Sequence, residues 1–425
     1  MASLTHSLQR AQVSTFSALS NNHFRVYFAG QLVSMSGTWM QSVAQSWLVF
    51  HLTQSPLWLG IVACSSGIAS LLCSPIAGVI VESRSRRQIL LVTQTVQMLL
   101  AFTLAYLTVV NVVQVWHVVV LAFILGITNA FDAPSRQAIV KDLVGPEHLA
   151  SGISVNSLIF NSARIFGPTV AGLTLATVGA GWCFLLNGAS FLAVIASLLA
   201  IKVPEVSRPP SHLSPLQQVR DGLRFSRHHE TIKPLLLLAA VTSVLSVNIM
   251  TQLPAFAATT LNSPIYGYST LTTAQGIGAV LAGLLVVVCS RFGRGRVTSV
   301  MLLVFCSAIV IASRVTEVLP AALLMCVVGF SMVLMFVTMN TMIQTAVPDE
   351  YRGRVLSLYT LTFFGLNPFG ALALGQIATV IGVPDAIAVY AILNLVIVVG
   401  ILARWPSLWQ NKHLEVSKQP LAFSE

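Results

Sequence analysis

The sequence predicts an all-α integral membrane protein with twelve transmembrane helices in two pseudo-symmetric bundles of six. Three observations carry this prediction. Only 8% of the 425 residues are charged, whereas about 25% is typical of a soluble domain. The apolar residues form runs long enough to cross a bilayer as helices, for which about 20 residues are needed. Several residues also recur at a constant offset in the two halves of the chain.

The apolar runs follow one another along most of the chain. Short turn-forming gaps separate them, such as Ser55-Pro56 and Asn262-Ser263-Pro264. We place the transmembrane helices at residues 24–50, 57–81, 89–110, 115–137, 151–177, 180–201, 234–260, 268–290, 297–313, 319–343, 353–380 and 384–404.

The positions of Lys and Arg predict the orientation. With both termini in the cytoplasm, every Lys and Arg except Arg164 and Arg314 lies in or at the edge of a terminal segment or a loop after an even-numbered helix. Cytoplasmic loops of membrane proteins are enriched in these residues. We therefore expect a multi-pass protein of the cytoplasmic (inner) membrane with both termini cytoplasmic. The net charge of +10 has the same origin, so no nucleic acid partner is expected.

The longest polar interruption divides the chain into two halves. Its second part alternates Val219, Leu223 and Phe225 with arginines, which predicts a short basic helix lying on anionic lipid at the cytoplasmic surface. The predicted organisation is a cytoplasmic N-terminal tail (1–23), a six-helix bundle (24–201), a cytoplasmic linker (202–233), a second six-helix bundle (234–404) and a cytoplasmic C-terminal tail (405–425).

The two halves contain an internal repeat. An offset of 203 residues pairs Gly126 with Gly329 and Gly172 with Gly375, and aligns further residues nearby. Many secondary transporters are built from such repeats, with the substrate site between them near the middle of the membrane.

Two loops carry a family resemblance. Residues 78–87 (GVIVESRSRR) and residues 290–296 (SRFGRGR) resemble the short basic signature of the major facilitator superfamily. Glu82 replaces the usual aspartate of that signature, Ser83 the usual arginine and Ser85 the usual glycine.

Two further segments support the resemblance. Residues 164–172 (RIFGPTVAG) are similar to the Gly-Pro signature of exporters of that superfamily. Residues 24–60 and 129–144 resemble the branch that contains the enterobactin exporter and macrolide efflux proteins. The resemblance implies the major facilitator fold, alternating access and export of small molecules from the cytoplasm.

Polar residues inside the predicted helices are candidates for a substrate cavity. Ser34, Thr38, Gln41 and Gln45 recur every three or four residues and share one face of a helix. Helix packing is the alternative role for this stripe. Asn161, Asn248, Gln252, Asn340 and Asn367 complete the polar candidates.

Arg164 is the one charged residue near the middle of any predicted helix. An arginine at this depth needs a partner, a hydrated cavity or an anion. It predicts recognition of an acidic or phenolic substrate, or an ion pair that breaks during transport. The alternative is a lock onto carbonyl groups of a neighbouring helix.

Asp132 and Arg136 are four residues apart at the cytoplasmic end of the fourth predicted helix. They are candidates for a gate or for proton coupling, and a structural salt bridge is the alternative. The resemblance further implies that Glu82 and the loop arginines latch the two bundles together, while topology alone also explains these arginines. This set contains Arg84, Arg86, Arg87, Arg291 and Arg294.

Gly167, Pro168 and Gly172 are candidates for a hinge, because proline removes a backbone hydrogen bond and bends a helix. Close helix packing through the two glycines is the alternative.

The predicted function is secondary active export of a small, siderophore-like or drug-like molecule by alternating access, with proton antiport. The chain contains no nucleotide-binding loop and no catalytic or metal-binding motif, so neither an enzyme nor a cofactor or metal is expected. The expected partners are the substrate, protons and membrane lipid, and a monomer is expected. A facilitated-diffusion uniporter or an importer is the alternative, and a non-transporting membrane sensor is a remote one.

Overall fold

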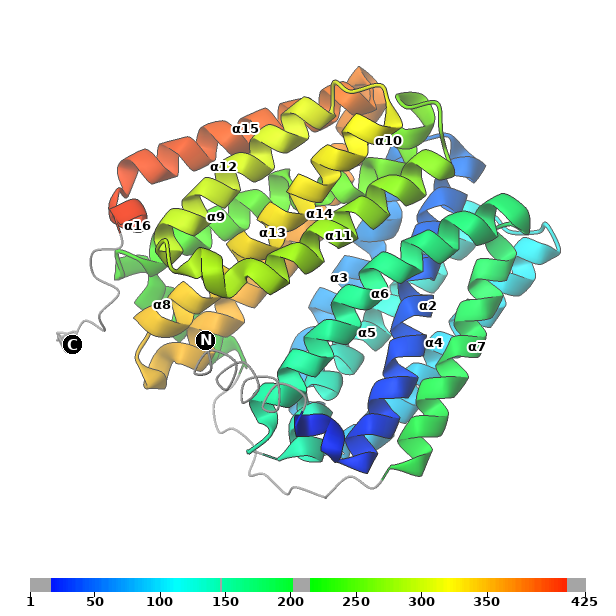
Figure 1. Cartoon of the computed structure of the whole chain (residues 1–425), viewed down its shortest axis with the longest axis horizontal. Coiled ribbons are helices and arrows are strands. Elements are labelled where there is room, and N and C mark those ends of the chain that lie inside the picture. Colours follow the sequence, from blue (N-terminus) through cyan, green and yellow to red (C-terminus); the bar gives the residue numbers. More distant parts are fainter. Residues whose placement is uncertain (1–16, 146, 202–214, 411–425) are drawn as a thin grey trace, which may run out of the picture. The chain divides into compact units, whose positions relative to one another are not determined.

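The computed structural model describes residues 17–145, 147–201 and 215–410, and these are almost entirely helical (Figure 1). Within them, ten helices are long and apolar enough to cross a membrane. Two further long helices, α2 (Asn22–Thr53) and α6 (Leu149–Thr177), are not among these ten. These two helices contain the predicted polar stripe and Arg164. The predicted all-α membrane fold is confirmed, and both predicted tails lie largely outside the described residues.

The helix bounds follow the predicted ones closely. The ten apolar spans are α3 (Pro56–Ser83), α4 (Arg86–Val109), α5 (Val115–Val144), α7 (Ala180–Ala200), the segment formed by α9 (Ile232–Leu245), η2 (Val247–Gln252) and α10 (Leu253–Thr259), α11 (Tyr266–Ser290), α12 (Arg294–Ala312), α13 (Val318–Ala346), α14 (Asp349–Ile381) and α15 (Val383–Arg404). The short helices are η1 (Ser17–Ser20), α8 (Pro215–His228) and α16 (Ser407–Gln410).

The chain divides into two compact units. Unit 1 consists of Met1–Gln54, Ser65–Pro210 and Tyr268–Thr273, and unit 2 consists of Ser55–Cys64, Ser211–Gly267 and Ala274–Glu425. The main boundary lies in the predicted linker, at residues outside the described ranges.

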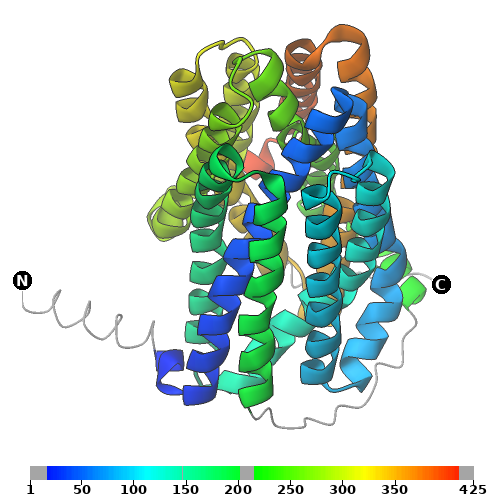
Figure 2. The same ribbon diagram turned by 90° about the vertical axis from the view of Figure 1, so that its right-hand side faces the viewer.

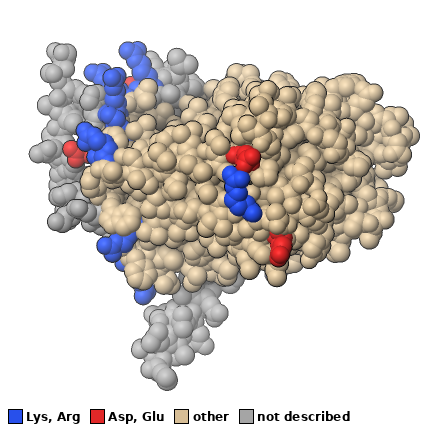
Figure 3. Space-filling view, turned by 90° about the horizontal axis from the view of Figure 1, so that it is seen from above, with Lys and Arg blue, Asp and Glu red and all other residues tan. Residues whose placement is uncertain are grey.

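Within unit 1, α2 packs along both α6 and α7, and α4 packs along α5 and α7 (Figures 1 and 2). Large apolar side chains from these helices form a buried cluster that includes Phe24, Tyr27, Leu90, Ile139 and Leu198. Many apolar side chains are nevertheless exposed, such as Leu72 and Leu173, and Figure 3 shows a surface that is mostly free of charged residues. Exposed apolar surface of this extent suits a lipid environment.

The repeated glycines occupy equivalent helix contacts. A Cβ atom on Gly126 of α5 would lie closer than 3.0 Å to the carbonyl group of Ser66 in α3, and a Cβ atom on Gly329 of α13 would lie equally close to that of Gln275 in α11. Both glycines therefore let two backbones approach closely, as small residues do in membrane helices.

We expect Gly126→Ala and Gly329→Ala to lower the thermal midpoint of the purified protein. The new methyl group meets a backbone carbonyl, which cannot move aside as a side chain would, and overpacking costs about 1–3 kcal/mol. Gly283→Ala in α11 is the matched control, because a Cβ atom there meets no other atom within 4 Å. Equal midpoints for all three variants would contradict this account.

The seventh predicted span, residues 234–260, is not a continuous α-helix. It breaks at Ser246 and continues as the 3₁₀-helix η2, although residues 243–252 contain neither proline nor glycine. Polar side chains occupy the break: Asn248 Nδ2 donates to the carbonyl oxygens of Ser243, at 2.6 Å, and Val244, at 3.1 Å. These bonds satisfy backbone groups that a regular helix would pair internally.

The predicted linker helix exists as α8, and it packs on the first turns of α14 in unit 2. The rings of Phe225 and Tyr351 stack with their centroids 4.8 Å apart. Arg354 pairs with Asp221 at 3.5 Å, and Gly222 lies against the Arg354 carbonyl group. One face of α8 therefore packs against α14.

His229 joins α8 to α9, and its Nδ1 accepts from the backbone N–H of Thr231 at 3.2 Å. Burial lowers the pKa of His229, while the backbone of Ala346 and the charge of Glu230 act in the opposite direction. The folded state thus favours the neutral ring, and its contribution to stability is complete above the unfolded pKa of about 6.5.

We expect this contribution to be lost as the pH falls below about 6.5. His229→Gln should therefore lose less thermal stability than the wild type when the pH is lowered from 7.5 to 5.5, as measured from the thermal midpoints in detergent. Equal losses in the two proteins would show that His229 does not sense pH.

Candidate substrate site and charged network

Arg164 lies in α6 with only 9% of its surface exposed. Its guanidinium carbon is 5.4 Å from the centroid of the Trp39 ring in α2. Among the described residues, no carboxylate lies within salt-bridge distance of this guanidinium. A buried arginine without a counter-ion carries a high desolvation cost, so an anion at this position would be stabilised.

Two aromatic rings lie beside Arg164. Trp39 meets Phe160 of α6 edge to face, with ring centroids 5.6 Å apart, and Phe160 is 44% exposed. Aromatic pairs of this geometry offer flat apolar surface. Sequence reasoning missed Trp39, because the residue that meets it is distant in the chain.

The predicted hinge residues lie at helix contacts. A Cβ atom on Gly167 would lie 3.0 Å from the Ser36 carbonyl oxygen and the Met40 nitrogen, and still closer to Trp39. A Cβ atom on Gly172 would lie closer than 3.0 Å to the Ser269 side chain. The helix α6 continues past Pro168 to Thr177 without a break. These contacts agree with the packing alternative, and Gly167 also sets the distance between α2 and Arg164.

The predicted stripe of α2 has mixed surroundings. Ser34 is buried, Thr38 is exposed and Gln45 is partly exposed. Thr38 donates to the Ser34 carbonyl oxygen at 3.0 Å, and Gln41 accepts from Asn187 of α7 at 2.7 Å. Gln41 is therefore engaged in a contact between helices of unit 1.

The remaining polar candidates are mostly bonded locally. Asn161 donates to the Ser157 carbonyl oxygen at 2.8 Å, and Gln252 donates to that of Pro56 at 3.2 Å. Asn340 accepts from Gln344 within α13. Asn367 is partly exposed, whereas Asn248 is buried at the break described above.

Asp132 of α5 is the centre of a buried polar network. Its side chain is 1% exposed and forms an ion pair with Arg136. Its Oδ1 accepts from the hydroxyl of Thr93, at 3.0 Å, and from the amide of Gln94, at 2.6 Å, both in α4. Three donors from α4 and α5 therefore hold this carboxylate in place.

Arg136 is held from a third helix. Its guanidinium contacts the sulfur of Met35 at 3.6 Å. In the amide orientation that satisfies both residues, the Gln31 oxygen accepts from Arg136 at 2.9 and 3.2 Å. The pair that the sequence predicted is thus part of a network joining α2, α4 and α5. Sequence reasoning identified Asp132 and Arg136 but missed Gln31, Thr93 and Gln94.

Two of the predicted gate arginines act inside unit 1. Arg86 pairs with Asp142, and both side chains are buried. Arg87 donates to the carbonyl oxygens of Leu198, at 2.6 Å, and Leu199, at 3.0 Å, near the end of α7. The sequence does not predict Asp142 as a helix residue, because the predicted fourth span ends at residue 137, whereas α5 continues to Val144.

The other predicted gate residues are more accessible. Glu82, Arg84 and Arg291 are exposed, and Arg294 is partly exposed.

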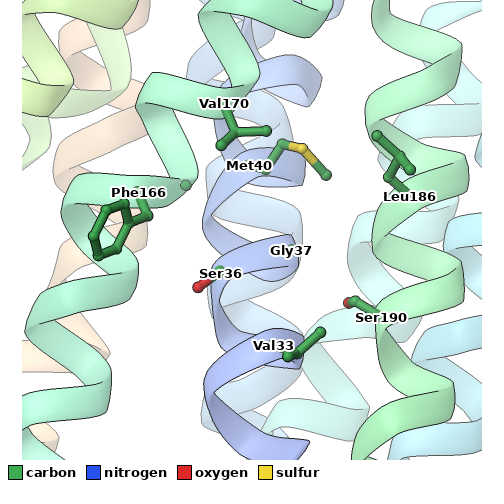
Figure 4. A pocket seen from close by; sticks show the side chains of 9 residues that line it. Val33, Ser36, Gly37, Met40, Phe166, Val170, Leu186 and Ser190 are labelled. Carbon is green, nitrogen blue, oxygen red and sulfur yellow. The ribbon is translucent and has the colours of Figure 1, made fainter.

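An apolar groove of about 180 Å³ lies between α2, α6 and α7 (Figure 4). Its lining includes Val33 and Met40 from α2, Phe166 from α6 and Leu186 from α7. None of the predicted polar cavity residues lines this groove, but Gly167, which packs against Trp39, does. Among the described residues, no group of three or more His, Cys, Asp or Glu side chains could hold a metal ion.

The sequence matches the transmembrane secretion effector family of the major facilitator superfamily over residues 13–422. The chain belongs to this family. The family resemblance seen in the basic loops and the Gly-Pro segment is therefore confirmed, and the protein is a major facilitator transporter.

Curated relatives of this family member include transporters and efflux pumps. The chain is 26% identical to the staphyloferrin A transporter of Staphylococcus aureus over 384 residues, which cover 88% of this chain and 94% of the relative. It is 24% identical to the multidrug efflux pump Tap of Mycolicibacterium fortuitum over 400 residues, covering 92% and 96%.

A solved transporter shares the fold. The crystal structure of the nucleoside transporter NupG aligns with a TM-score of 0.71 at 13% identity, covering 92% of this chain and 100% of that one.

Proposed function

We propose that the protein exports a small molecule bearing an acidic group across the cytoplasmic membrane by alternating access. The observation that carries this proposal is Arg164, which is buried in α6 and has no carboxylate partner among the described residues. A planar guanidinium recognises a carboxylate or phenolate through paired hydrogen bonds. A molecule that supplies such a group removes the cost of the isolated charge.

The aromatic neighbours narrow the substrate class. Trp39 and Phe160 present ring surface next to Arg164, and such surface favours a flat or aromatic substrate body. The names of two relatives, a staphyloferrin A transporter and a multidrug efflux pump, support a siderophore-like or drug-like molecule. Thr38 and Gln45 of α2 are further candidates for residues that line the substrate path.

Proton antiport is the proposed energy source, with Asp132 as the titrating group. Because Asp132 is ion-paired with Arg136, it takes up a proton only if that pair opens. We therefore propose that Arg136 leaves Asp132 during the transport cycle. Glu82, Arg84, Arg291 and Arg294 are the proposed gate residues.

A facilitated-diffusion uniporter is the second candidate. The specific observation in its favour is that Asp132 is 1% exposed and already bonded to Arg136, Thr93 and Gln94, so that it serves as a structural link between α4 and α5. We further propose a monomer in the inner membrane with both termini in the cytoplasm.

Accumulation of test compounds in a host that lacks its own exporters tests the proposed export. Cells that express the protein should accumulate less of one or more acidic compounds than cells without it. Purified protein in liposomes should then move that compound faster when a pH gradient is imposed. A rate that ignores the gradient would favour the uniporter, and no effect on any acidic compound would contradict the proposed function.

A further inference from the structure

The helix α8 has two different faces. Gly222, Phe225 and Ser226 are buried against protein, where Phe225 stacks on Tyr351 and Asp221 pairs with Arg354. The attachment to α14 fixes which side of α8 faces outward.

The outward side is basic and contains one large apolar side chain. Arg220, Leu223, Arg224 and Arg227 are all exposed. Their spacings of three and four residues place them on one face of the helix. Leu223 is 56% exposed on this face. Arginines around an exposed leucine are typical of a helix that lies in a lipid interface.

The position of α8 in the chain places the helix next to the membrane surface. α8 ends at His228, and the membrane-spanning segment Ile232–Thr259 begins a few residues later. Lys233 at its start is exposed, and its ammonium group is 5.9 Å from the centroid of the Trp405 ring. Tryptophan and lysine next to a span are typical of the headgroup region.

We propose that the face formed by Arg220, Leu223, Arg224 and Arg227 binds the headgroups of anionic phospholipids in the cytoplasmic leaflet. The arginines neutralise the phosphate groups, and Leu223 enters the upper acyl region. α8 then links the start of α14 to the lipid surface. The inference rests on the proposed orientation of the termini and is independent of the transported substrate.

A fluorescent label on the full-length protein tests this contact. Leu223→Cys carries an environment-sensitive bimane, and the parent protein, labelled in parallel, gives the background from its six native cysteines. The protein is reconstituted in phosphatidylcholine vesicles with or without about one-third phosphatidylglycerol. The anionic vesicles should shift the emission to the blue, and about 1 M salt should reverse the shift, since the Debye length is then only about 3 Å.

Charge variants distinguish lipid binding from a structural effect. Replacing Arg220, Arg224 and Arg227 together by glutamine should abolish the shift, because each basic residue near an anionic surface contributes roughly a fivefold preference. Replacing the same three by lysine should retain it.

Three results would overturn the proposal: equal emission in both vesicle types, a shift that survives the glutamine triple variant, or the same shift from inorganic phosphate added to phosphatidylcholine vesicles. The last result would identify a free anion as the ligand. None of these readouts requires transport, so a failed lipid contact is distinguishable from a failed export assay.

Discussion

Arg164→Ala is expected to abolish export of the acidic substrate while the protein still folds. Hydrogen bonds to charged groups contribute about 1.5–3 kcal/mol, so the loss of the guanidinium should weaken substrate binding roughly 10-fold to 150-fold. Arg164→Lys retains the charge but not the paired geometry, and it should export at an intermediate rate. Efflux at matched expression is the measurement.

The stability of the same variants separates a binding site from a structural lock. Because the buried guanidinium has no carboxylate partner among the described residues, Arg164→Leu should leave the thermal midpoint unchanged or raise it. If Arg164 instead held two helices together, Arg164→Leu would lower the thermal midpoint. Arg314→Ala is the matched control, since Arg314 is 61% exposed and pairs with Asp385 at the surface. Wild-type export by Arg164→Ala would remove this arginine from the substrate site.

Asp132→Asn is expected to cause the largest loss of stability among these variants. It leaves Arg136 without its counter-ion, and breaking a buried ion pair costs about 3–5 kcal/mol. Thr93 and Gln94 also lose a charged acceptor. Thermal midpoints of Asp132→Asn, Arg136→Gln and the double variant measure the effect.

The double variant should be more stable than the sum of the two single losses implies, because the residues share one network. Additive losses would show that the two charges act independently. If the wild type responds to the pH gradient and the double variant does not, the Asp132–Arg136 pair is required for proton coupling. If its response to the gradient is unchanged, coupling through Asp132 is excluded.

The helices and the repeat could be predicted because their causes are local. Long apolar runs specify spans, and glycines at the same repeat position, such as Gly126 and Gly329, specify close contacts. The break at Ser246 was not predictable in this way. It has no proline or glycine and depends on Asn248 bonding to backbone groups in the folded chain.

The candidate site was only partly predictable for a different reason. Arg164, Asp132 and Arg136 could be predicted because a charged side chain inside an apolar segment is costly to bury and therefore marks a candidate site. Their partners, such as Trp39 and Gln94, come from other helices, and nothing in their own sequence surroundings points to them. In the stripe of α2, the helical spacing is predictable but its role is not. Gln41 follows the spacing of the stripe, yet its side chain bonds to Asn187 of α7.

The most direct test of the account is the cellular accumulation of matched compounds that differ only in their acidic group, such as an aromatic carboxylic acid and its neutral amide. The exporter-deficient host is compared with and without the protein, and with the Arg164→Ala variant at equal expression. The account predicts that the protein lowers accumulation of acids but not of amides, and that Arg164→Ala abolishes the difference. Equal export of acid and amide, or full export by Arg164→Ala, would contradict it.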